Sequence, residues 1–185
     1  SDTMGQSKIV VFRHLSRGNE EQAQAANKEF ERCYAQLVAD GQCSPIPHAE
    51  DVITSFRSRG IKVALTTGFA RETQNAIIDA LGWHDIADVV LCPGPGVRGR
   101  PYPDMALAAL MQTETESVQS MIVVGDTSSD VITGLRAGAR ASIGVLTGAH
   151  NASQFSEAGA THIIIMTGDP FALDAVAQLQ DAVRS

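Results

Sequence analysis

Apolar residues recur every three to four positions between Glu20 and Leu37, and this period is typical of an amphipathic helix. The apolar stripe consists of Ala23, Ala26, Phe30, Tyr34 and Leu37. The segment Cys43–Pro47 follows the stripe and contains two prolines, which cannot continue a helix and also restrict the residue before them. We therefore predict two parts of the chain, residues 1–44 and residues 45–185.

Beyond Pro47 the pattern changes, because short apolar runs alternate with helical segments of about ten residues. We predict helices over residues 49–59, 71–81, 105–112, 129–137, 152–158 and 170–183. We predict strands over residues 62–66, 89–91, 121–125, 141–145 and 161–165. This alternation predicts a doubly wound α/β fold, in which helices cover both faces of a parallel sheet. Such sheets bind ligands at the carboxyl ends of their strands.

The composition excludes several classes of partner. A formal net charge of −7 disfavours nucleic acid and anionic membranes, because binding either requires a concentrated basic face. No apolar run approaches the roughly 20 residues of a membrane span, and the N-terminus lacks a signal-peptide pattern, so we predict a cytoplasmic protein. Cys33, Cys43 and Cys92 lack CxxC spacing, and we interpret them as packing residues.

The strongest chemical signal is the loop after the strand predicted over residues 121–125. Gly125 allows a tight turn, and Asp126 and Asp130 stand four residues apart across the start of the next helix. Two carboxylates that converge there suit a hard cation such as Mg²⁺. The alternative is structural: Asp126 or Thr127 caps the helix, and Asp130 complements the helix dipole.

Two further loops stand at predicted strand ends. Thr66, Thr67 and Gly68 offer hydroxyl groups and backbone N–H groups that can hold a phosphate oxygen, although a helix cap explains them equally well. Arg100 precedes a proline in a turn, and its guanidinium can offer paired donors to carboxylate and phosphate oxygens.

Together these loops resemble the motifs of the haloacid dehalogenase-like hydrolase superfamily. Gly125–Asp130, followed by residues 131–139, resembles the fourth motif of that superfamily. The resemblance implies that Asp126 and Asp130 hold Mg²⁺. It also implies that Thr67, or Thr66 in a shifted alignment, and Gly68 bind the transferred phosphoryl group, and that Arg100 offsets the charge of the nucleophile and phosphate.

The N-terminal segment points to the phosphonatase-like branch of the superfamily. Met4-Gly-Gln-Ser-Lys8 resembles part of the helical cap domain of that branch, so residues 1–44 are interpreted as a partial cap and residues 45–185 as a core without its first strand. By resemblance, Lys8 forms a Schiff base with a substrate aldehyde. Val11 stands where the branch has a histidine, which argues against that activity.

The superfamily's nucleophile, the first aspartate of an Asp-x-Asp-x-Thr motif, is absent from these residues. On this interpretation the motif precedes Ser1. The expected function is then Mg²⁺-dependent hydrolysis of a small phosphonate or phosphate monoester through an aspartyl-phosphate. In the alternative, residues 8–16 are the first strand, Arg13 replaces the aspartate, and the protein is an inactive pseudoenzyme with a binding or structural role. A small phosphorylated or phosphonate substrate is the expected partner, and a homodimer remains open.

Overall fold

The computed structural model of the chain describes residues 5–148 and 150–165. Among these residues the helices are α1 (Lys8–Leu15), α2 (Glu20–Ala39), α3 (Ala49–Ser58), α4 (Arg71–Leu81), α5 (Asp104–Gln112), α6 (Ser128–Ala137) and α7 (Ala152–Glu157). The strands are β1 (Ala64–Thr66), β2 (Val89–Leu91), β3 (Ile122–Gly125), β4 (Ala141–Val145) and β5 (His162–Ile164). The helix predicted over residues 170–183 lies outside the described residues.

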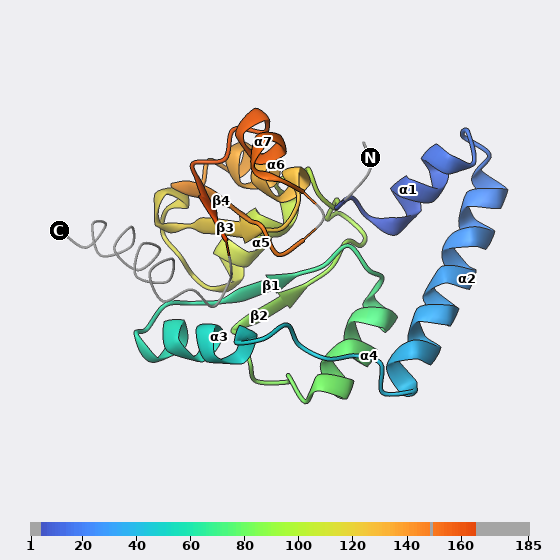
Figure 1. Cartoon of the computed structure of the whole chain (residues 1–185), viewed down its shortest axis with the longest axis horizontal. Coiled ribbons are helices and arrows are strands. Elements are labelled where there is room, and N and C mark those ends of the chain that lie inside the picture. Colours follow the sequence, from blue (N-terminus) through green and yellow to red (C-terminus); the bar gives the residue numbers. More distant parts are fainter. Residues whose placement is uncertain (1–4, 149, 166–185) are drawn as a thin grey trace.

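The strands pair in parallel, as predicted, but they form two sheets. β1 pairs with β2, with Ala64 opposite Val89, while β3, β4 and β5 form a second sheet in that order, with Ile122 opposite Ala141. Figure 1 shows the pair β1–β2 beside the sheet that contains β3 and β4. The predicted α/β class with parallel strands is confirmed, whereas the expected single sheet is divided between β1 and β3 in the described residues.

β4 is buried on both faces, and its alternating side chains contact helices on opposite sides. Ala141 and Ile143 pack against Phe56 of α3 on one face. On the other face Gly144 lies against α7, where an added Cβ would come within 2.5 Å of the Phe155 ring. The strand period of two therefore places α3 and α7 on opposite faces of the sheet, as the doubly wound prediction requires.

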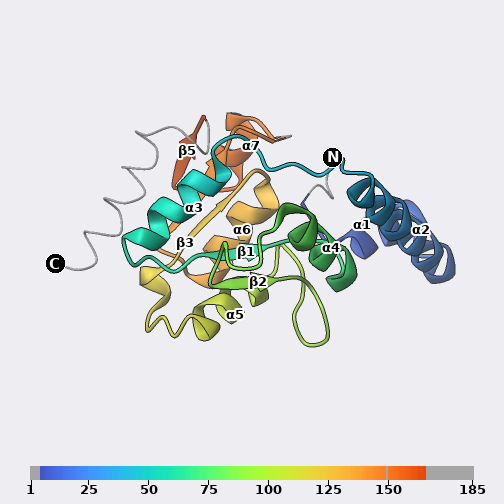
Figure 2. The same ribbon diagram turned by 90° about the horizontal axis from the view of Figure 1, so that it is seen from below.

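The pair β1–β2 is covered in the same way. Leu91 packs against Ala108 and Ala109 of α5. On the opposite face Leu65 lines a small apolar cavity together with Ile77 of α4. Figure 2 shows α4 between the sheets and the pair α1–α2, which lies at one end of the molecule.

Residues 8–15 form helix α1, so the alternative in which residues 8–16 are the first strand is wrong. α1 packs against α2, and α2 packs against α4. The aromatic rings of Phe30 and Phe69 stack with their centroids 6.1 Å apart, and the ring centroids of Tyr34 and Phe69 are 4.5 Å apart. Glu31 accepts a hydrogen bond from the hydroxyl of Thr73, which ties α2 to α4. The division at residue 44 stays a prediction.

The cysteines do not all follow the packing interpretation. Cys92 is buried, and burial raises the pKa of its thiol, whereas Cys33 is exposed, so the interpretation is wrong for Cys33. No helix in residues 5–148 or 150–165 has the length and apolar character that a membrane span requires.

Candidate active site

The predicted site loops meet at the carboxyl ends of β1 and β3. Gly68 follows β1, and an added Cβ there would lie 3.6 Å from Nη2 of Arg100. Nη1 of Arg100 donates a hydrogen bond to Oδ1 of Asp130 in the first turn of α6. The structure therefore brings together the three loops that the sequence placed at strand ends.

Asp130 is 4% exposed, and both of its carboxylate oxygens accept hydrogen bonds. Oδ2 accepts from the backbone N–H of Thr127 at 3.1 Å, as in a capping box at the start of α6, and it also accepts from the Thr127 hydroxyl at 2.5 Å. Gly125 leaves room for this carboxyl group, because an added Cβ would lie 2.7 Å from Oδ2 and closer still to Cβ and Cγ of Asp130. These hydrogen bonds give Asp130 a structural role at the start of α6.

Asp126 has a different environment, because its side chain is exposed at the end of β3. Gly148, in the loop after β4, lies against it, and an added Cβ at Gly148 would come within 2.6 Å of the Asp126 Cγ. Within residues 5–148 and 150–165, no three His, Cys, Asp or Glu side chains are grouped so that they could hold a metal ion. Mg²⁺ needs only one or two carboxylates when waters and a substrate phosphate complete its shell, and the Asp126 carboxylate fits that requirement.

Thr67 occupies the turn after β1, and Thr66 is the last residue of the strand itself. The backbone N–H of Thr67 donates to the carbonyl of Leu91 at 3.0 Å, and its Oγ1 accepts from the N–H of Phe69 at 3.3 Å. A threonine hydroxyl that accepts one bond can still donate its hydrogen. Thr67 therefore has a donor for an anion at the strand end, which favours the alignment with Thr67 over Thr66.

The Arg100 side chain is 16% exposed, and its Nε is buried without a hydrogen-bond partner in the described residues. A buried unpaired guanidinium N–H is costly, so this atom is suited to an acceptor that enters the site. Arg98 and Asp104 hold the loop around Arg100, because the backbone N–H, Nε and Nη2 of Arg98 each donate to the Asp104 carboxylate at 2.8 Å. The side-chain and backbone hydrogen bonds from Arg98 lower the pKa of Asp104 to about 2.

The segment from Gly5 to Lys8 crosses the same edge, which the sequence did not reveal. An added Cβ at Gly5 would lie 2.9 Å from Cβ of Thr127, and one at Gly99 would lie 3.0 Å from Cβ of Ser7. The N–H of Lys8 donates to the carbonyl of Gly68 at 3.4 Å. Glycines at these positions were visible in the sequence, but nothing local showed that they allow close approach of two distant segments.

Lys8 lies beside the Gly68 loop. Its Nζ is 5.3 Å from the centroid of the Phe69 ring and 5.6 Å from that of Phe30. These distances are within the range of cation–π contacts. His14 is exposed on α1.

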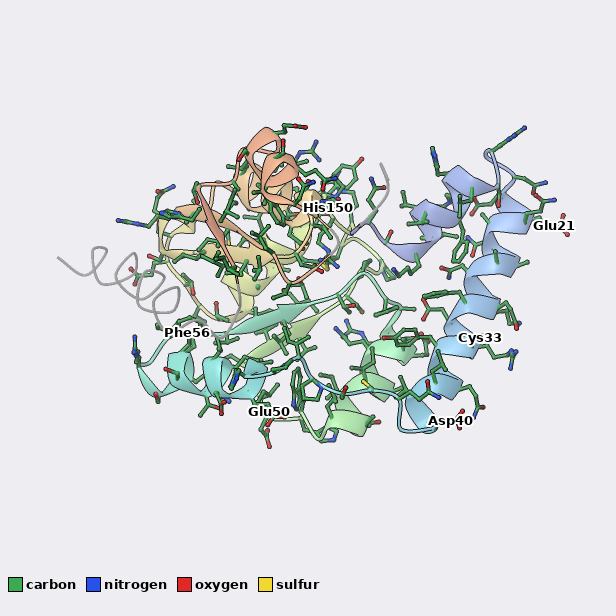
Figure 3. All side chains as sticks on the ribbon, in the orientation of Figure 1. Glu21, Cys33, Asp40, Glu50, Phe56 and His150 are labelled. Carbon is green, nitrogen blue, oxygen red and sulfur yellow. The ribbon has the colours of Figure 1, made fainter. Side chains whose placement is uncertain are left out.

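His150, which no motif in the sequence singled out, contacts the acidic loop. Its Nδ1 accepts a hydrogen bond from the backbone N–H of Ser128 at 2.8 Å and lies 2.9 Å from the Ser128 hydroxyl. Because Nδ1 accepts from a backbone N–H, the neutral ring carries its proton on Nε2, which is buried without a partner in the described residues. Figure 3 shows His150 among the side chains around α6 and α7. His150 thus helps to cap α6 next to Asp126.

Residues 4–138 match the haloacid dehalogenase-like hydrolase family. The chain belongs to this family. This haloacid dehalogenase-like chain has the parallel α/β architecture expected from the resemblance.

The relatives of this haloacid dehalogenase-like chain agree with the assignment. A phosphonoacetaldehyde hydrolase from Bacillus cereus is 34% identical over 139 residues, which are 75% of this chain and 51% of that protein. The chain thus spans about half the length of this curated relative. A hydrolase from Pseudomonas syringae has a TM-score of 0.79 at 23% identity, covering 97% of this chain and 80% of that one. A phosphonoacetaldehyde hydrolase like protein from Oleispira antarctica has a TM-score of 0.78 at 24% identity, covering 97% and 79%. These two likenesses show the fold.

Proposed function

We propose that the chain is the main part of a Mg²⁺-dependent hydrolase that acts on a small phosphonate or phosphate monoester through an aspartyl-phosphate. The observation that carries this proposal is that the loops of Gly68, Arg100 and Asp130 meet at one edge of the sheets. The nucleophilic aspartate comes from a segment outside the 185 residues. Its carboxylate oxygen bonds to phosphorus as the bond to the leaving oxygen or carbon breaks, and water then releases inorganic phosphate.

In this proposal Asp126 is the carboxylate that holds Mg²⁺, and Asp130 is a positioning residue. The prediction from the sequence made both residues metal ligands. The hydrogen bonds of Asp130 to Thr127 and Arg100 favour a role in which it orders the loop and orients the guanidinium. Bound Mg²⁺ would offset negative charge on the phosphoryl oxygens.

Thr67 and Arg100 bind and orient the phosphoryl group. The Thr67 hydroxyl and the Gly68 N–H donate to its oxygens, while Nε of Arg100 offers a further donor. Thr67 and Gly68 directly follow β1, and the bonds from Arg98 to Asp104 hold the loop that carries Arg100. Little reorganisation is therefore needed when charge develops in the transition state.

We propose that Lys8 determines whether this site cleaves a phosphonate or a phosphate ester. An imine between Lys8 Nζ and a substrate aldehyde, formed with loss of water, would accept the electron pair of the breaking C–P bond. The position of Lys8 against the Gly68 loop supports this role, and the name of the Bacillus cereus relative supports the substrate class.

A second candidate function is binding without catalysis. It is favoured by one observation: Asp130, which the resemblance made a metal ligand, is already engaged by Arg100. In that case the protein would bind a phosphate compound through Thr67 and Arg100 and would release none.

The test is phosphate release from phosphonoacetaldehyde and from p-nitrophenyl phosphate by the full-length gene product that contains these residues, with Mg²⁺ and with EDTA. We expect release only with Mg²⁺. Loss of phosphonoacetaldehyde turnover in Lys8→Arg, with ester turnover retained, indicates a phosphonatase.

A matched pair of variants tests the phosphate site. Thr67→Val should lower kcat/KM by about tenfold to a hundredfold, because it removes a donor to developing charge. Thr66→Val is the control, since Thr66 belongs to the strand, and it should change kcat/KM by less than about threefold. Equal effects of both variants, or no release from either substrate with Mg²⁺, would contradict the proposed mechanism.

A further inference from the structure

A groove rich in arginine lies between α1 and the loop that carries Arg100. It holds about 1520 Å³, including the part that opens to solvent. Among the described residues that line it, four are arginines and one is a carboxylate: Arg13, Arg98, Arg100, Arg136 and Asp104. The whole chain has a formal net charge of −7, so this local excess of positive charge runs against the charge of the protein.

Three of the four arginines have a carboxylate partner. The pairs are Arg13–Glu20, Arg98–Asp104 and Arg100–Asp130. Arg136, on α6, has no such partner in the part of the chain that the structure describes, and its Nη1 donates to the carbonyl of Pro101 at 3.0 Å. A carbonyl does not neutralise a guanidinium, so the groove keeps an unbalanced positive charge.

The ring of Tyr102 brings two of the guanidinium groups together. Cζ of Arg98 is 4.1 Å from the centroid of this ring, and Cζ of Arg136 is 5.9 Å from it. Both distances are within the range of cation–π contacts. Asp104 fixes Arg98 further, because its carboxylate accepts from Nε and Nη2. Two like charges therefore share one ring, with one carboxylate beside them.

Both guanidinium groups have donors to spare. Nη1 of Arg98, and Nε and Nη2 of Arg136, have no hydrogen-bond partner within residues 5–148 and 150–165. The Arg98 side chain is 61% exposed, so a ligand can reach it. A guanidinium presents its N–H groups as a planar fork that matches the oxygens of a phosphate, and a phosphate dianion has enough oxygens to accept from two forks.

The groove is distinct from the candidate active site, although Arg100 contributes to both. Ser7 lies between them, because an added Cβ at Gly68 would be 3.5 Å from Cα of Ser7, and one at Gly99 would be 3.0 Å from its Cβ. Thr67, which is proposed to bind the phosphoryl group in the active site, is not among the described residues that line the groove. The proposed hydrolysis therefore leaves the arginines of the groove unexplained.

We propose that this groove is a second anion site, in which Arg98 and Arg136 bind a phosphate group, either inorganic phosphate or the phosphate of a small molecule. The volume of the groove leaves room for the rest of such a molecule. Arg98 stands two residues before Arg100 in the chain, so the bound phosphate would add a contact that holds the loop of Arg100. The proposal does not rest on the proposed hydrolysis, because binding here needs neither Mg²⁺ nor a nucleophile.

The test is an NMR titration of the protein in EDTA at constant ionic strength, with inorganic phosphate, glucose 6-phosphate or glucose. The side-chain Nε–H signals of Arg98 and Arg136 report on the groove, and the backbone amide of Gly68 reports on the candidate active site. We expect saturable shifts of both arginine signals with the two phosphates and none with glucose. Tighter binding of glucose 6-phosphate indicates a phosphorylated small molecule as the ligand, and equal binding indicates the free ion.

A matched pair of variants separates a built site from a general electrostatic effect. Arg136→Gln should weaken phosphate binding at Arg98 by about tenfold or more, because it removes charge-assisted hydrogen bonds. Arg140→Gln removes the same charge just before β4, outside the groove, and should change binding by less than about threefold. Arg136→Lys keeps the charge without the fork and should recover part of the loss. Equal weakening by Arg136→Gln and Arg140→Gln, or no saturable shift in the unchanged protein, would overturn the proposal.

Two further variants test the ring and the independence of the two sites. Tyr102→Leu changes no charge at neutral pH, and it should weaken binding at Arg98 and Arg136 by about threefold or more, because the ring that holds both groups is lost. Unchanged binding in Tyr102→Leu would contradict a built site. Thr67→Val should reduce the shift at Gly68 and leave the arginine signals unchanged, so failure of the proposed active site and failure of this groove give different results.

Discussion

Gly125→Ala is the sharpest test of how the acidic loop is built. The added Cβ would lie 2.7 Å from Oδ2 of Asp130 and closer still to its Cβ and Cγ, atoms that cannot move far from the α6 backbone. Asp130 would have to leave the capping box with Thr127 and its contact with Arg100. Overpacking of this kind costs about 1–3 kcal/mol and loss of a cap about 1 kcal/mol, so we expect the free energy of unfolding to fall by about 2–4 kcal/mol.

This change should lower the melting temperature by about 5–15 °C for a chain of this size. Chemical unfolding can be followed through the fluorescence of Trp83, the single tryptophan. Gly94→Ala is the control, because no heavy atom lies within 4 Å of a Cβ added there. If Gly125→Ala unfolds within about 0.5 kcal/mol of the Gly94→Ala control, the described packing of Asp130 against Gly125 is wrong.

Three further predictions concern charge and capping around the site. Asp126→Asn should weaken Mg²⁺ binding by about tenfold or more in calorimetric titration, because it removes a ligand charge, while Asp51→Asn on the distant α3 should not. His150→Ala should lower the free energy of unfolding by about 1–2 kcal/mol in urea titrations, since it removes the acceptor of the Ser128 N–H, and His150→Asn should recover part of that loss. The pKa of Asp104 falls from 3.8 to about 2 on folding, so its stabilising effect is present above about pH 4 and is lost as the pH falls toward 2. Arg98→Gln should therefore reduce the fall in urea midpoint between about pH 4 and pH 2, and an unchanged fall would contradict the assignment.

The secondary structure of the core could be predicted because local periodicity determines it. The helix over 71–81 and the strands over 89–91 and 141–145 were predicted with the bounds that the structure has. Residues 8–15 could not be assigned in this way, because a short apolar run fits a strand and a helix equally well. Their helical form is accompanied by packing of α1 against α2, which is a tertiary contact.

The sequence could predict the residues of the candidate site, but it could not predict the contacts between their side chains. Parallel strands end at one edge, so the sequence could place Thr67, Arg100, Asp126 and Asp130 near one another. It left open whether Asp130 binds metal or complements the dipole of α6, because that choice depends on where the Arg100 side chain lies, 30 residues away in the chain. Contacts at such separations leave no local pattern.

The sequence by itself determined the α/β class, the parallel strands and the loops that hold the polar groups, because hydropathy periods and turn residues act over a few neighbouring positions. Only the tertiary structure decided the division into two sheets, the groove between α1 and the loop of Arg100, and the contact of His150 with Ser128. The physical reason is that each depends on which distant segments pack side by side, and this is decided by how all the elements bury their apolar faces together.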